Sequence, residues 1–148
     1  MNRDEARLLY FRMFTEIGII NQLSSNRLER VLPDGVSIAQ FSVLNHFVRL
    51  GGQWAPSRLA RAFQVTKGAM TNTLQRLEAQ GLVKIVPDNA DARAKLVEIT
   101  AAGRKMRETC IRATGSIMSE VFVSLQLDEV RAAMPILEKL RKALDTTR

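Results

Sequence analysis

The segment from residue 56 to residue 99 places the tightest limits on the fold, because its helix boundaries carry residues with strong positional preferences. Pro56 is favoured at the first position of a helix, where its missing N–H group would have no partner. Only a tight connection fits between that short helix and Thr66, whose side chain is a good N-cap for a second helix. Gly81 suits the C-terminal end of this second helix, after about residue 80. The pattern predicts two helices joined by a tight turn.

Two short runs with strand character follow this helix pair. Residues 83–86 and 95–99 are rich in Val, Ile and Leu, with charged residues between them, and a polar turn over residues 87–94 separates the runs. Such a pair predicts a two-stranded hairpin. The order helix, turn, helix, hairpin is that of a winged helix-turn-helix, so the fold class is mainly α with a small β-hairpin wing.

The flanking segments predict four more elements. We expect helices over about residues 5–31, from a Ser37–Gln40 capping box to about residue 50, from Thr100 to about residue 125, and over about residues 127–144. The first and last of these helices carry more apolar residues than one surface stripe needs: Leu8, Leu9, Phe11, Met13, Phe14, Ile17, Ile20 and Leu23, then Leu127, Val130, Leu137, Leu140 and Leu144. Burial by the same chain and by another chain would account for this excess.

Residues 1–148 are therefore expected to form a single protomer, which consists of one central module and the helices on either side of it. Residues 37–99 form the predicted winged helix-turn-helix. Residues 1–32 and 101–148 supply the predicted dimerisation helices.

The positive charge of the chain is concentrated in its central third. Lys and Arg number 22 against 15 Asp and Glu, and the net charge is +7. Residues 56–107 hold 10 basic and 4 acidic residues, whereas the segments before and after them have net charges of +1 and 0. Clustered cations favour an anionic partner, and neutralisation of DNA phosphates needs such clustering.

The second helix of the pair has the side chains that read DNA bases. If Met70, Leu74 and Leu77 face the core, the opposite face is polar. Asn and Gln can pair with adenine, Arg and Lys can pair with guanine, and a helix fits the major groove. The predicted recognition residues are Thr66, Lys67, Gly68, Thr71, Asn72, Gln75 and Arg76, with Ser57, Arg58 and Arg61 of the preceding helix as candidate phosphate contacts. An ordinary solvated helix face is the alternative for this polar surface.

The combination of motifs resembles the MarR (multiple antibiotic resistance regulator) family of winged-helix transcription regulators. The matching residues are Leu59-Ala60, Thr66-Lys67-Gly68, Leu77-Glu78 with Gly81-Leu82, Asp91 with Arg93, Lys95-Leu96-Val97, and Thr100 with Gly103. The resemblance extends to the order of the flanking helices and implies a triangular homodimer on inverted-repeat double-stranded DNA. It favours a repressor, although activation stays open.

The resemblance also assigns roles in the wing and points to an effector. Arg93 would enter the minor groove, with Asp91 orienting it, and Lys95 would be a further DNA-binding residue of the wing. Ala90 stands where the family often has another arginine. Relatives respond to small aromatic or phenolic anions, for which His46 and Arg49 are the candidate residues here. A surface histidine and a solvated arginine are the alternative. We expect Trp54 and Cys110 to be packing residues, with no thiol switch at Cys110.

Other functional classes receive little support from the sequence. One cysteine and one histidine make a metal site improbable by composition, and no cofactor or enzyme motif is present. The longest uncharged run, residues 35–48, is too short for a bilayer, and the N-terminus lacks an apolar signal region, so a cytoplasmic protein without membrane contact is expected. Another winged-helix family and an RNA-binding or protein-interaction module remain as alternatives.

Overall fold

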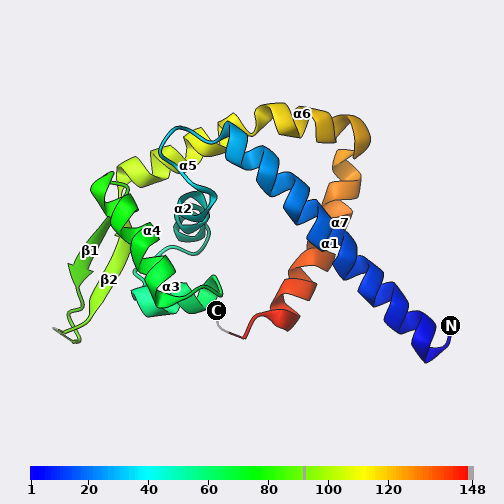
Figure 1. The fold of residues 1–148 in the computed structure, drawn as a ribbon, viewed down its shortest axis with the longest axis horizontal. Helices are drawn as coiled ribbons and strands as arrows, with labels where there is room; N and C mark the ends of the chain where they lie inside the picture. Colours follow the sequence, from blue (N-terminus) through cyan, green and yellow to red (C-terminus); the bar gives the residue numbers. More distant parts are fainter. Residues whose placement is uncertain (92, 147–148) are drawn as a thin grey trace.

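A computed structural model describes residues 1–91 and 93–146 (Figure 1). Residue 92, inside the expected wing turn, and residues 147–148, at the end of the expected dimerisation range, lie outside the described residues. The elements run α1 (Arg3–Val31), α2 (Ile38–Leu50), α3 (Pro56–Ala62), α4 (Lys67–Ala79), β1 (Val83–Pro87), β2 (Lys95–Ile99), α5 (Ala101–Ala113), α6 (Gly115–Ser124) and α7 (Leu127–Leu144). The expected fold class, mainly helical with a two-stranded wing, is confirmed.

The module formed by α2, α3, α4 and the hairpin holds the main hydrophobic core. Its buried residues are Val43, Leu44, Phe47, Trp54, Leu59, Ala60, Met70, Leu74, Leu77, Leu82, Val83 and Val97. The strands β1 and β2 pair antiparallel, with Val83 opposite Ile99 and Pro87 opposite Lys95. Trp54 adds a bridge to Val97 on the free edge of β2, through backbone hydrogen bonds of 3.0 and 2.9 Å. The small core therefore fixes α4 and the wing relative to each other.

The joint between this module and α5 is closely packed. The Thr100 side chain caps α5 by accepting the backbone N–H of Gly103, and its hydroxyl donates to the carbonyl of Gly81. A Cβ atom added to Gly103 would lie 2.1 Å from the carbonyl oxygen of Leu82 and 2.7 Å from a side-chain carbon of Ile99. Only glycine allows this approach, so the start of α5 is fixed against the hairpin.

The expectation of one unbroken helix from residue 101 to residue 125 is wrong. The structure ends α5 at Ala113 and begins α6 at Gly115. At Thr114 the backbone N–H and the hydroxyl both bond to the carbonyl of Ile111, at 3.0 and 2.6 Å. Threonine that bonds back to the backbone, followed by glycine, disfavours a regular helix at this point.

The helices α1, α6 and α7 contain no buried residue within the described chain. In Figure 1, α1 crosses α7 on the side of the molecule away from the wing, and an exposed Arg27–Glu120 ion pair connects α1 to α6. Many large apolar side chains are exposed here, including Phe11 at 68% and Val123 at 83%. None of the described helices is long and apolar enough to cross a membrane.

Candidate nucleic-acid interface

The two faces of α4 differ as the sequence predicts. Met70, Leu74 and Leu77 are 3%, 2% and 0% exposed and anchor the helix in the core. Thr66 caps the helix by accepting the Ala69 N–H at 3.1 Å, as expected. The predicted recognition residues are all exposed: Thr66, Lys67, Gly68, Thr71, Asn72, Gln75 and Arg76. A helix anchored by one face thus leaves the predicted recognition residues exposed on the other.

A cleft of about 330 Å³ joins the start of α4 to the start of α3 and to the start of β2, next to the wing turn. Its lining comprises Ala55, Pro56, Ser57, Lys67, Thr71, Ala94 and Lys95. It therefore brings together predicted residues from three elements: Ser57 of the phosphate set, Lys67 and Thr71 of the recognition set, and Lys95 of the wing. The ammonium groups of the two lysines make this cleft attractive to an anion.

The tip of the wing is shaped by two aspartates. The Asp88 carboxylate accepts the backbone N–H of Ala90 at 2.9 Å, and the Asp91 carboxylate accepts the backbone N–H of Arg93 at 3.0 Å. No ion pair joins the Asp91 carboxylate to the Arg93 guanidinium in the part of the chain that the structure describes, so the contact between the two residues is the one to the Arg93 backbone. Asp91 stabilises the turn as short acidic side chains commonly do. Arg93 is exposed and also lines a groove between the wing and Glu78 of α4.

The base of the wing carries a charged pair on its exposed face. Lys84 Nζ lies 2.8 Å from Glu98 Oε1, and the side-chain amide of Gln53 donates to Glu98 Oε2 at 2.6 Å. The bond from Lys84, then that from Gln53, lowers the pKa of Glu98 below its usual value. Glu98 therefore stays ionised at neutral pH and offsets one lysine near the interface.

An arginine over the ring of a tryptophan is one feature that sequence reasoning missed. The guanidinium carbon of Arg58 lies 3.9 Å from the centre of the Trp54 ring, and the Trp54 indole N–H donates to the Gly51 carbonyl at 2.8 Å. Trp54 was expected to be a packing residue, and its 7% exposure confirms this. Two residues four apart face each other when both lie in one helix. Trp54 precedes α3, so the spacing of Trp54 and Arg58 did not predict the contact.

The expectation of a surface histidine is wrong. His46 is 2% exposed, and its ring lies 4.3 Å from that of Trp54, 5.2 Å from that of Phe63 and 6.1 Å from that of Phe47. It faces the core because it lies one turn from the buried Val43 on α2. Arg49 is exposed at the end of the same helix. The structure does not bring the two together in a cavity.

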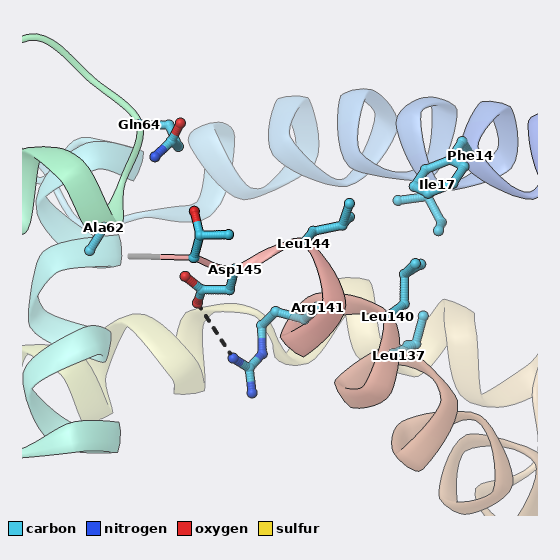
Figure 2. A pocket seen from close by; sticks show the side chains of 10 residues that line it. Phe14, Ile17, Ala62, Gln64, Leu137, Leu140, Arg141, Leu144 and Asp145 are labelled. Carbon is cyan, nitrogen blue, oxygen red and sulfur yellow. Dashed lines mark ion pairs between the residues drawn. The ribbon is translucent and has the colours of Figure 1, made fainter. Parts of the chain in front are cut away.

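A larger cavity than the cleft at the start of α4 lies elsewhere, between the terminal helices and α3 (Figure 2). It has a volume of about 570 Å³ and is lined by Phe14, Ile17, Ala62, Gln64, Leu137, Leu140, Arg141, Leu144, Asp145 and Thr146. Figure 2 shows leucines from α7 and two apolar side chains from α1 on its walls, with the Arg141–Asp145 ion pair at the end towards α3. The two charged groups are 3.8 Å apart. Sequence reasoning did not predict this cavity, because its walls come from three distant segments.

A helix pair with a wing, a polar and cationic outer face and a separate set of apolar helices defines the class of winged-helix transcription regulators. Residues 34–94 match the model of the MarR family. The multiple antibiotic resistance protein MarR of Escherichia coli strain K12 is 32% identical over 126 residues, which cover 84% of this chain and 87% of that protein. The transcriptional activatory protein BadR of Rhodopseudomonas palustris is 25% identical over 147 residues, covering 95% and 82% of the two chains.

Solved structures agree with these relatives. The regulator BldR of Sulfolobus solfataricus superposes with a TM-score of 0.75 at 25% identity, over 97% of this chain and 98% of that one. A mutant MarR of Escherichia coli, crystallised with operator DNA, has a TM-score of 0.68 at 29% identity, over 95% and 99% of the chains. The chain belongs to the MarR family, and the relatives named here are regulators rather than enzymes.

Proposed function

We propose that this protein regulates transcription as a homodimer bound to an inverted repeat in double-stranded DNA. The observation that carries the proposal is the arrangement of α4, anchored by three buried apolar residues while Asn72, Gln75 and Arg76 stand exposed beside the wing. Such a helix suits the major groove, and the hairpin suits the adjacent minor groove. The MarR variant crystallised with operator DNA supports this reading.

The exposed apolar faces of α1, α6 and α7 support the dimer. A monomer rarely leaves so many large side chains in water, and a second copy of the same three helices would cover them. Two copies related by a two-fold axis would present two recognition helices. The half-sites should then lie about one helical turn apart, or a multiple of it.

The binding test compares two labelled probes: a duplex from the region upstream of the gene of this protein, and a single-stranded RNA of the same length. We expect the duplex to bind more tightly. We also expect Gln75→Ala to reduce the preference for that duplex over a scrambled one, whereas Arg58→Ala, at a candidate phosphate contact, should weaken both duplexes alike. Tighter binding to the RNA would contradict the proposal and favour an RNA-binding module.

The direction of regulation is proposed to be repression. A dimer spanning about two helical turns of a promoter blocks access of polymerase by occupying the DNA. The name of BadR, a transcriptional activatory protein, is a reason to test this point directly. Transcription of a reporter behind the bound duplex should rise when the gene for this protein is deleted; a fall would identify an activator.

A small aromatic or phenolic anion is proposed as the effector, in the cavity between α1, α7 and α3. The volume of about 570 Å³, the leucine-rich walls and one arginine suit such a ligand better than the buried His46 does. The carboxylate of the ligand would compete with Asp145 for Arg141. We expect 4-hydroxybenzoate to weaken duplex binding by the wild type but not by Arg141→Leu, with uncharged 4-hydroxybenzamide as the control ligand. Equal responses of the two proteins would exclude this cavity.

A further inference from the structure

We propose that Trp54 is a positioning residue for DNA binding, which holds the Arg58 guanidinium flat so that its edge clamps a backbone phosphate. The inference rests on the proposed DNA-binding function and assigns a role to a residue pair that belongs neither to the exposed face of α4 nor to the wing tip. The pair is called the Trp54–Arg58 stack below.

The indole is held rigidly in place. The indole N–H donates to the Gly51 carbonyl at 2.8 Å. The backbone N–H and the backbone carbonyl of Trp54 both form hydrogen bonds with Val97 of β2. The ring of His46, itself buried, lies 4.3 Å away at an interplanar angle of 77°. Trp54 therefore offers a fixed platform, and the position of anything stacked on it is fixed as well.

The guanidinium on that platform is available to a ligand. Its carbon lies 3.9 Å from the ring centre, while the side chain as a whole is exposed. No ion pair within residues 1–91 and 93–146 includes Arg58. A stacked guanidinium has one face covered and its N–H donors directed outward in the plane, and this geometry matches two oxygens of a phosphate. Stacking also reduces the rotamer freedom that binding would otherwise remove.

The location of the stack favours the DNA backbone as the source of that phosphate. Trp54 directly precedes Ala55, Pro56 and Ser57, which line the same cleft as Lys67 at the start of α4. A duplex with its major groove on α4 would therefore run its backbone along the edge of the module where the stack lies. Arg61, on the same short helix, is exposed without an aromatic ring beneath it in the part of the chain that is described.

The decisive variants change geometry while they preserve charge. Arg58→Lys should weaken duplex binding about tenfold, because an ammonium on a flexible stem cannot stack flat or bind two oxygens in one plane. Arg61→Lys is the comparison on the same helix and should weaken binding less than Arg58→Lys does, because no aromatic ring fixes the Arg61 guanidinium in the described part of the chain. Equal effects of the two substitutions would overturn the proposal.

A double-mutant cycle separates positioning from mere stability of the module. Trp54→Leu should weaken binding in the wild-type background and have little further effect in an Arg58→Ala background. Trp54→Phe, which keeps an aromatic face, should restore most of the affinity. If Trp54→Leu costs the same in both backgrounds, Trp54 acts on folding alone and the proposal fails.

Trp54 is the single tryptophan of the chain, so its fluorescence reports directly on the stack. Adding the upstream duplex should change the emission of the wild type and of Arg61→Lys, but not of Arg58→Ala, with anisotropy of the labelled duplex measured in the same cuvette. If anisotropy shows that the duplex binds but the wild-type emission does not change, the proposed role of the stack is wrong. If the duplex does not bind at all, the proposed DNA-binding function itself is wrong. Inorganic phosphate at the same ionic strength should leave the emission unchanged, and an equal change would contradict a DNA-specific clamp.

Discussion

Asp91 and Arg93 have separate tasks in the wing, although the sequence motif pairs them. The Asp91 carboxylate stabilises the turn by accepting the Arg93 backbone N–H, while the Arg93 residue is exposed. An arginine at this position can enter a narrow minor groove, where negative potential is concentrated. The two residues should therefore respond differently to substitution.

Arg93→Ala is expected to weaken duplex binding by roughly 1–3 kcal/mol, since it removes a specific cationic contact. Asp91→Asn keeps an oxygen that accepts the same backbone bond and should change affinity by less than about 0.5 kcal/mol, as surface substitutions usually do. Fluorescence anisotropy measures both affinities, and circular dichroism checks that both variants fold. A loss for Asp91→Asn as large as that for Arg93→Ala would show that the aspartate charge, rather than the turn, matters.

Cys110 is expected to resist modification in the folded protein. It is 0% exposed in a cluster with Leu32 and Val36, and burial raises the pKa of its thiol above the usual value. Its thiolate fraction at pH 8 is therefore lower than that of a free cysteine. Iodoacetamide should label the native protein slowly and label the denatured protein with one equivalent. Rapid labelling of the native protein would contradict this packing.

Residue-level predictions from the sequence succeeded where local spacing decides the outcome. Thr66 caps α4, and Met70, Leu74 and Leu77 are buried, because helical spacing fixes these positions. His46 could not be placed in the same way. Its burial depends on Trp54, which precedes α3, and on Phe63, in the turn after α3, and both meet it only in the folded chain.

At the scale of elements, the joint between the hairpin and α5 depends on one glycine. A Cβ at residue 103 would collide with the backbone carbonyl of Leu82, which has no side-chain freedom to move aside. Gly103→Ala should therefore lower the free energy of unfolding by about 2–4 kcal/mol, as strained packing in a core does. Thermal unfolding measures the loss, and Gly68→Ala, where the added Cβ meets nothing within 4 Å, is the control. Equal stability of the two variants would show that α5 is not fixed by this contact.

The element order was predictable, and one boundary was not. Caps and breakers such as Pro56, Thr66 and Gly81 mark the ends of the module's helices. The break at Thr114 was missed because a lone Thr-Gly pair inside an apolar pattern is compatible with a continuous helix. The local hydrogen bonds to Ile111 that end α5 became visible only in the structure.

At the scale of the whole molecule, the terminal helices leave large apolar side chains exposed, which a second copy would cover in the proposed dimer. We expect a dimer of about twice the 16.6 kDa protomer mass in sedimentation at micromolar concentration. Phe11→Glu, which places a charge on an exposed apolar face of α1, should shift the protein to monomer without unfolding the winged module. Gln22→Glu, an exposed polar position on the same helix, is the control. A wild type that sediments as a monomer would exclude the proposed dimer.

The basic residues and the exposed apolar residues lie in different parts of the molecule. The excess of basic residues lies in residues 56–107, which contain α3, α4 and the wing, whereas the terminal helices are close to neutral. The structure therefore separates a basic end from an end with exposed apolar helices. The proposed dimer would use the first to bind DNA and the second to hold two recognition helices at a fixed spacing.

The most direct test is the dependence of duplex affinity on salt concentration. If α4, the wing and the start of α3 contact the DNA backbone in both protomers, several phosphates are neutralised at once. The logarithm of the association constant should then fall with the logarithm of salt concentration with a slope steeper than about −4. A flat dependence, or a slope that single-stranded RNA reproduces at equal affinity, would contradict DNA binding by the winged helix.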